Sequence, residues 1–310
     1  MSTTVARWVV HQLVAWGVKT VYGVAGDAIL PLLAALEEHP QIRFYSVIHE
    51  ATAAFMASAQ AKLTGELGVC VATSGPGVTN LLNGLMDAKK DRAPVLALTG
   101  QVASYNLNTD YKQAVDENLL LAPAVGFSAL ATTPAVANDL LVKALRAAIS
   151  QRRPVHLGFT KDIWTQPVTE PVRPPEPYLT TKPQSSPEVI TGAFPLLNEA
   201  ERPVILAGRG IAGLGPLLLD LATHWESGIV LTMPAKGTVP GEHPLVLGGL
   251  GPGGSEASSK ILAEADLLLI TGATWWPDLY LPEQPKIVQI DTAVENIGGK
   301  IPVTYGIVGD

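Results

Sequence analysis

Residues 68–80 read Gly-Val-Cys-Val-Ala-Thr-Ser-Gly-Pro-Gly-Val-Thr-Asn, an apolar run that ends in a glycine-proline-glycine turn. A short apolar run bounded by turn residues is typical of a buried strand, and we expect a helix over residues 78–89. The preceding segment has the same order, with a strand over 43–47 and an alanine-rich helix over 49–64. Short connections between apolar strands and helices predict a parallel sheet that is covered on both faces.

The same alternation extends in both directions from this region. The elements expected before it are a helix over 3–17, a strand over 20–24 and a helix over 28–36. Those expected after it are a strand over 94–99, a polar stretch over 101–125, a helix over 134–150 and a strand over 155–159. Together they predict one doubly wound α/β domain over residues 1–165.

Prolines crowd together between residues 166 and 187, where neither helical nor alternating periodicity survives. Such a composition predicts a semi-rigid, extended linker. A second α/β unit follows over residues 188–310, with strands at 204–207, 229–231, 267–270 and 287–291 and helices at 214–225 and 255–264. The predicted fold class is therefore α/β, with two doubly wound parallel-sheet domains.

The composition bounds the possible functions. Of the 310 residues, 47% are apolar and 16% are charged, which is typical of a soluble α/β protein. A net charge of -7 disfavours nonspecific nucleic-acid binding. The single cysteine, Cys70, cannot form an intramolecular disulfide and favours an intracellular setting. Since the chain lacks a secretory signal pattern and any apolar run of roughly 18 residues, we expect a cytoplasmic protein without a membrane partner.

Three residue types in this frame point to a ligand. Glu50 opens the predicted helix 49–64, where a carboxylate either complements the helix dipole or serves as a functional group. The glycines at 75 and 77 are ordinary turn residues, but they also allow a flat ring to approach the backbone closely. Asn80 lies in the first turn of the next helix, where its amide can face the same ligand.

Four segments together resemble the thiamine-diphosphate-dependent enzyme family of pyruvate oxidase and acetolactate synthase. They are His49-Glu50-Ala51, residues 72–85, Asp87-Ala88 and residues 93–101. The resemblance covers essentially the whole chain. It implies that the first domain binds the cofactor's pyrimidine ring and that the segment after the linker is the central domain of the family.

The resemblance implies a role for several residues. Glu50 would hydrogen-bond a ring nitrogen of the aminopyrimidine and so promote loss of the proton from the thiazolium carbon. The residues that would line the pyrimidine pocket are Gly26, Thr73, Pro76, Gly77 and Asn80. His49 either takes part in acid–base steps or is a packed helix residue.

Gln113 matches a glutamine that lies near the substrate in the family, and it is the second expected catalytic residue. The family segment usually reads aromatic-Phe-Gln-Glu, whereas this chain has Tyr111-Lys112-Gln113-Ala114. The implied reaction is decarboxylation of pyruvate or a related 2-oxo acid, followed by oxidation or carboligation. The departure from the family pattern puts the substrate in doubt.

In the second domain, residues 208–213 read Gly-Arg-Gly-Ile-Ala-Gly after a strand, which fits the spacing of a dinucleotide phosphate loop. No acidic residue ends the next strand, so the ribose contact expected for NAD is missing. By resemblance the ligand would be FAD, held by Gly208, Gly210, Lys236, Gly272 and Asp291. The alternative is a central domain that binds no nucleotide. Trp275 and Trp276 either stack on a ring or cover the core.

The family's third domain holds the diphosphate and its magnesium ion, and no matching motif occurs in this chain. We therefore expect no metal ligands here and a homo-oligomer or a partner subunit that supplies that domain. Three explanations stay open: a piece of a longer enzyme, one subunit of a split enzyme, or a noncatalytic assembly or nucleotide-binding module that keeps the fold.

Overall fold

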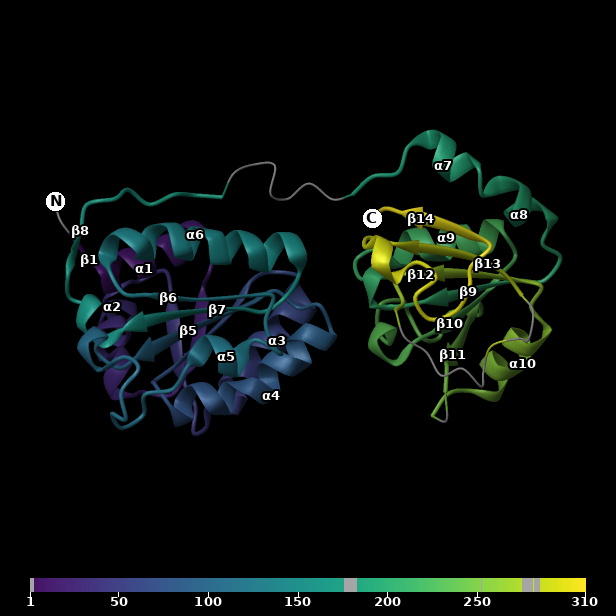
Figure 1. The fold of residues 1–310 in the computed structure, drawn as a ribbon. Coiled ribbons are helices and arrows are strands. Elements are labelled where there is room, and N and C mark those ends of the chain that lie inside the picture. Colours follow the sequence, from purple (N-terminus) through teal and green to yellow (C-terminus); the bar gives the residue numbers. More distant parts are fainter. Residues whose placement is uncertain (1–2, 176–182, 252, 275–280, 282–284) are drawn as a thin grey trace. The chain divides into compact units, whose positions relative to one another are not determined.

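The chain forms two compact units, residues 1–180 and 181–310, in the computed structural model (Figure 1). The structure describes residues 3–175, 183–251, 253–274, 281 and 285–310. Each unit contains one six-stranded sheet in which all neighbouring strands run parallel. The predicted fold class is thereby confirmed.

Unit 1 has the strand order β3-β2-β4-β5-β7-β6. Its strands are β2 (Thr20–Gly23), β3 (Arg43–Ser46), β4 (Gly68–Ala72), β5 (Val95–Gln101), β6 (Phe127–Ala131) and β7 (Val155–Thr160). Its helices are α1 (Val5–Ala15), α2 (Leu30–Glu38), α3 (Glu50–Thr64), α4 (Pro76–Lys90), α5 (Glu117–Leu121) and α6 (Pro134–Gln151). The strand β6 and the short helix α5 lie where no element was predicted.

The helices divide between the two faces of this sheet. One apolar core contains buried residues of α1, α2 and α6, and the other contains those of α3, α4 and α5 (Figure 1). The chain changes direction at neighbouring strands β2 and β4, because β3 lies beyond β2 and β5 lies beyond β4. In parallel α/β sheets, ligands bind outside the carboxyl ends of the strands at such a switch point.

Helices α3 and α4 approach each other unusually closely. A Cβ atom at Gly84 of α4 would lie 2.4 Å from the Cβ of Ala54 and 2.6 Å from the backbone of α3. Ala53, Ala54 and Ala57 are completely buried in this contact region. Small residues on both helices therefore set the distance between them.

The first part of the proline-rich stretch belongs to unit 1. Strand β8 (Pro167–Val168) pairs antiparallel with β1 (Thr3–Thr4). Farther along, the carbonyl of Arg173 accepts a hydrogen bond of 2.7 Å from the indole of Trp16. The extended linker predicted over 166–187 is thus bound to the domain at its beginning, because its backbone groups find partners on the N-terminal segment.

Unit 2 has the strand order β11-β10-β9-β12-β13-β14. Its strands are β9 (Pro203–Ala207), β10 (Gly228–Leu231), β11 (Val246–Gly249), β12 (Leu267–Thr271), β13 (Lys286–Asp291) and β14 (Tyr305–Val308). Its helices are α7 (Pro187–Thr191), α8 (Phe194–Glu199), α9 (Gly215–His224) and α10 (Glu256–Glu264). Numbered within the unit, this is the 3-2-1-4-5-6 order of dinucleotide-binding folds, with its switch point between β9 and β12.

Replacing Gly84 by alanine tests the close approach of α3 and α4. Alanine favours a helix by about 1 kcal/mol relative to glycine. The clash with Ala54 should nevertheless make Gly84→Ala destabilising by about 1–3 kcal/mol. Denaturant unfolding monitors this change, and Asn83→Ala on the exposed side of α4 is the control. A Gly84→Ala variant as stable as wild type would contradict the packing.

Candidate functional site

Glu50 and Asn80 meet at the carboxyl edge of the unit 1 sheet. Glu50 is the first residue of α3, and Asn80 lies in the first turn of α4. The side-chain amide of Asn80 donates a hydrogen bond of 2.9 Å to Oε2 of Glu50. Glu50 is only half-buried, so its carboxylate is fixed in orientation and still open on one side.

Gly77 and Thr73 form the wall beside this carboxylate. A Cβ atom at Gly77 would lie 3.4 Å from Oε1 of Glu50 and 3.1 Å from the Thr73 methyl group, so glycine leaves that side clear. Oε1 has no hydrogen-bond partner among the residues that the structure describes. A planar ligand with a donor nitrogen therefore finds a free acceptor next to bare backbone.

The floor of the site lies at the switch point between β2 and β4. Thr73 follows β4, and its hydroxyl accepts a hydrogen bond of 3.2 Å from the Ala28 amide. Gly26 follows β2, and a Cβ atom there would lie 2.4 Å from the Cβ of Thr73. Pro76 opens α4 at a position that suits its fixed φ. The structure thus brings together Gly26, Glu50, Thr73, Pro76, Gly77 and Asn80, and their roles toward a cofactor stay predictions.

Gln113 reaches the same turn from the loop after β5. Ser74, which is buried, donates a long hydrogen bond of 3.5 Å to Oε1 of Gln113. Gly75 has φ 66°, and a Cβ atom there would lie 2.8 Å from the Cβ of Gln113. Sequence reasoning did not identify Ser74, because an isolated serine in a turn carries no distinguishing signal.

His49 has a structural role in this arrangement. It is the N-cap residue of α3, and its Nδ1 accepts a hydrogen bond of 3.1 Å from the Ala51 amide. An N-cap satisfies one of the backbone donors that a helix start leaves unpaired. The sequence predicted either an acid–base residue or one packed within the helix, whereas His49 is exposed and caps the start of α3.

The glycines expected to bind a nucleotide in unit 2 contact one another. A Cβ atom at Gly208 would lie 2.1 Å from the Gly272 carbonyl oxygen, and one at Gly210 would lie 2.5 Å from the Gly272 Cα. The Gly210 amide donates a hydrogen bond of 3.0 Å to that carbonyl. Backbone packing between the loops after β9 and β12 therefore requires these glycines whether or not a ligand is present.

The other residues predicted for this second site differ in their burial and contacts. Asp291 is buried at the end of β13, and its Oδ1 accepts hydrogen bonds from the Ala293 amide and the Asn296 side chain at 2.9 and 2.7 Å. This carboxylate thus holds its own loop. Lys236 is exposed after β10. Trp275 and Trp276 lie outside the described residues.

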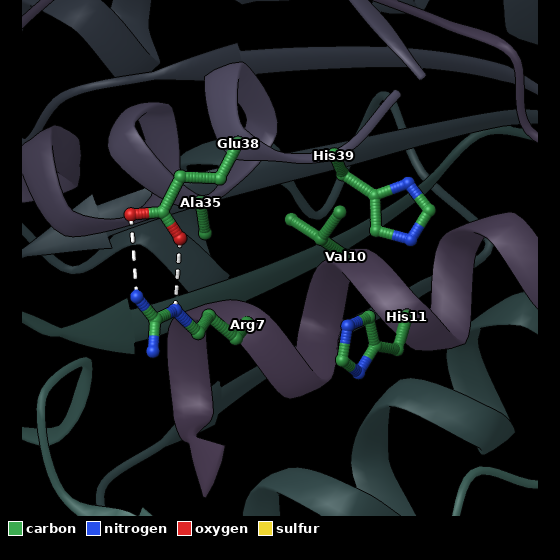
Figure 2. Close-up of a pocket in the computed structure, with 6 residues that line it drawn as sticks. All are labelled: Arg7, Val10, His11, Ala35, Glu38 and His39. Carbon is green, nitrogen blue, oxygen red and sulfur yellow. Dashed lines mark hydrogen bonds and ion pairs between the residues drawn. The ribbon is translucent and has the colours of Figure 1, made fainter. Parts of the chain in front are cut away.

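A separate groove of about 160 Å³ lies between α1 and α2 (Figure 2). It is lined by Arg7, Val10, His11, Ala35, Glu38 and His39. Arg7 and Glu38 form an ion pair of 2.9 Å at one end, and the two imidazole rings lie 5.4 Å apart at the other. None of the predicted site residues borders this groove.

The described part of the chain contains neither a metal-binding cluster nor a membrane-spanning helix. No group of three or more His, Cys, Asp or Glu side chains there is placed to hold a metal ion. Within the same residues, no helix combines the length and the apolar character needed to cross a membrane.

Unit 1 therefore has the fold of a doubly wound α/β domain, with an oriented carboxylate at the switch point of its sheet. Residues 3–120 match the family model described as thiamine pyrophosphate enzyme, N-terminal TPP binding domain. Residues 190–310 match the model described as thiamine pyrophosphate enzyme, central domain. The chain belongs to the thiamine pyrophosphate enzyme family.

Three relatives illustrate this similarity. YdaP of Bacillus subtilis, whose provisional name describes a thiamine pyrophosphate-containing protein, is 37% identical over 99% of this chain and 54% of its own length. The large subunit of acetolactate synthase isozyme 1 of Escherichia coli is 35% identical over 87% of this chain and 48% of its own length. Pyruvate oxidase of Lactiplantibacillus plantarum is 34% identical over 85% of this chain and 44% of its own length. The chain spans about half the length of these proteins.

His11 makes the stability of unit 1 depend on pH. His11 is exposed, and its partial desolvation in the groove lowers its pKa below 6.5; the charges of His39 and Arg7 lower the pKa further. The unfolded chain then binds a proton at this residue more readily than the folded chain, so stability falls as pH decreases through about 6.5.

We expect the unfolding free energy of His11→Gln to fall less steeply than that of wild type between about pH 7.5 and about pH 5.5. His39→Gln removes only one of the causes and should have a smaller effect in the same direction. Denaturant titrations at several pH values measure the slopes. Equal slopes for wild type and His11→Gln would contradict the assignment.

Proposed function

We propose that this chain provides the pyrimidine-binding and central domains of a thiamine-diphosphate-dependent enzyme that acts on pyruvate or a related 2-oxo acid. The reaction class is decarboxylation followed by oxidation or carboligation. The contact of Glu50 with Asn80 at the switch point carries the proposal, because it orients a carboxylate beside the open backbone of Gly77. The names of the acetolactate synthase and pyruvate oxidase relatives support the reaction class.

The residues fit the aminopyrimidine half of the cofactor. Oε1 of Glu50 is free to hydrogen-bond a ring nitrogen, while Asn80 holds the other carboxylate oxygen. Gly77 and Thr73 leave a flat space beside it. When bound, thiamine diphosphate supplies a carbon nucleophile and an electron sink for decarboxylation. The task of this chain's residues is to position the ring and to keep a proton available at Glu50.

We further propose that a diphosphate-binding domain outside these residues holds the magnesium ion, and that the site is completed in a homo-oligomer or with a partner subunit. Exposed apolar side chains on α3 and α4 and just before α3 support an interface there: Ile48 is fully exposed, Phe55 is 45% exposed, and Met56 and Met86 are 37% and 36% exposed. Sedimentation velocity checks this association, and a strictly monomeric chain would oppose a homo-oligomer.

The single buried Cys70 supports a cytoplasmic location, which cell fractionation tests.

FAD in unit 2 is proposed on the strand order alone, which forms a switch point between β9 and β12. The mutual packing of Gly208, Gly210 and Gly272 favours the alternative, a central domain without a nucleotide. A visible absorbance spectrum of the purified protein distinguishes the two, because oxidised flavin absorbs there and the polypeptide does not.

A second candidate is a noncatalytic assembly or nucleotide-binding module that retains the fold. The loop sequence favours it, since Lys112 and Ala114 replace the usual residues on both sides of Gln113. Gln113 is also exposed and in a left-handed conformation with φ 66°.

Calorimetric titration with thiamine diphosphate, with and without magnesium, tests the proposed division of the site. We expect the isolated chain to bind the cofactor weakly and without a magnesium requirement, because a diphosphate needs cation neutralisation and backbone donors. Tight, magnesium-dependent binding would show that these residues hold the diphosphate themselves and would overturn the proposed partner domain.

Glu50→Gln tests the catalytic role in the assembly that contains the diphosphate-binding domain. The amide preserves the shape of the side chain but cannot hold the proton, so turnover of pyruvate should fall by about 10²–10⁴-fold. The unfolding midpoint should stay close to that of wild type. Glu66→Gln, at an exposed position between α3 and β4, is the matched control. An active Glu50→Gln assembly would refute the role.

A further inference from the structure

A buried polar network lies beneath α5, apart from all the residues assigned above. Thr99 of β5 and His156 of β7 have no exposed surface, and Glu117 of α5 is 3% exposed. The Thr99 hydroxyl lies 2.7 Å from Oε2 of Glu117 and 2.8 Å from Nε2 of His156. The carboxylate and the imidazole are themselves 3.4 Å apart.

The network continues to the surface at the edge of the sheet. Nδ1 of His156 lies 2.7 Å from the hydroxyl of Ser128 on β6. The Ser128 hydroxyl donates a hydrogen bond of 2.7 Å to Oδ1 of Asn118, the residue after Glu117. The chain of contacts therefore begins and ends on α5 and passes through three neighbouring strands.

The proton count in this network depends on the charge of Glu117 and the orientation of Asn118. With Glu117 ionised, the Thr99 hydroxyl donates to it, and Nε2 of His156 donates to the Thr99 oxygen. With Oδ1 of Asn118 facing Ser128, that hydroxyl donates to Asn118, and Nδ1 of His156 donates to the Ser128 oxygen. In this arrangement both ring nitrogens are protonated, and His156 is an imidazolium that balances the buried charge of Glu117.

Gly158 is the residue that leaves room for this ion pair. It lies in β7 directly opposite Thr99. A Cβ atom at Gly158 would lie 2.6 Å from Oε2 of Glu117. A glycine inside a buried strand commonly marks such a close approach.

Glu117 stands at the end of the loop that carries Gln113. At the start of this loop, Ser104 donates two hydrogen bonds of 2.7 Å to Asp162 from its amide and its hydroxyl. Toward the end of the loop, the Val115 carbonyl accepts a hydrogen bond of 2.8 Å from the side chain of Gln101, the last residue of β5. Between these points the loop borders a cavity of about 230 Å³. The loop is thus held at both ends, and in between Gln113 contacts the Ser74–Gly75 turn.

We propose that the Glu117–His156 ion pair, bridged by Thr99, is a positioning device that fixes the loop carrying Gln113 against the Ser74–Gly75 turn. The ion pair fastens the first turn of α5 to β5 and β7. The loop end at Val115 and Asp116 is fixed with it, so Gln113 is held beside the pyrimidine site. The proposal rests on the proposed function only for the task of Gln113 toward a substrate.

The protonation of His156 is measured directly on the wild-type chain by nitrogen NMR of labelled histidine, assigned with His156→Gln. We expect both ring nitrogens of His156 to have the chemical shifts of protonated imidazolium at neutral pH. An unprotonated ring nitrogen would overturn the proposal. The measurement uses no cofactor, so its outcome is independent of the proposed function.

Two variants of Thr99 separate positioning from general stability. Thr99→Val removes the bridging hydroxyl, and Thr99→Ser retains it. We expect amide hydrogen exchange over residues 107–116 to be about tenfold faster in Thr99→Val and close to wild type in Thr99→Ser, with exchange in β4 unchanged in both. Glu117→Gln should match Thr99→Val, and Glu66→Gln on the surface should match wild type.

Two results would overturn the positioning role. One is unchanged exchange over residues 107–116 in Thr99→Val. The other is an equal increase in this loop and in β4, which would show a loss of stability across the whole unit. Should Glu117→Gln fail to fold, the two Thr99 variants and the wild-type spectrum still decide the question. Cofactor titration, by contrast, tests only the proposed function.

Discussion

The close approach of α3 and α4 is the constraint on which the site depends. Because Gly84 has no side chain, α4 can lie against the backbone of α3 at Ala54. Both helices begin at the carboxyl edge of the sheet, and their short separation lets Asn80 reach Glu50. A bulkier residue along this seam would move the two helix starts apart. The alanine-rich composition of α3 is therefore a requirement of the site as well as of the core.

The sequence predicted the elements that local pattern determines. Apolar strands such as β4 and β5 and the long helix α6 were expected close to their observed bounds, since their periodicity and end signals lie within each segment. The short helix α5 and the strands β6, β11 and β14 were not expected. Their residues are partly exposed or too few to show a period, and their neighbours in the sheet stabilise them.

The residues of the two candidate sites could be predicted from the sequence to different extents. Glu50 and Asn80 belong to consecutive helices, and the resemblance named both. The glycines of unit 2 were ambiguous, because close backbone packing and nucleotide binding select the same residue type. Thr99, Glu117 and His156 are far apart in the sequence and form no recognisable sequence motif. They meet only because β7 lies between β5 and β6, which places Ser128 opposite His156 and Thr99 opposite Gly158.

Glu50 and Glu117 show how one residue type serves two purposes in one domain. Each begins a helix, where the partial positive charge of the helix end favours a carboxylate. Glu50 is half-buried, has a single amide donor and retains a free oxygen, so it can still form a hydrogen bond with a ligand. Glu117 is buried between the Thr99 hydroxyl and the His156 imidazole, and the proposed role of its charge is to hold α5 in place. The depth of burial and the number of bound donors differ between the carboxylate proposed to act on the cofactor and the one proposed to position the loop, and sequence position reveals neither quantity.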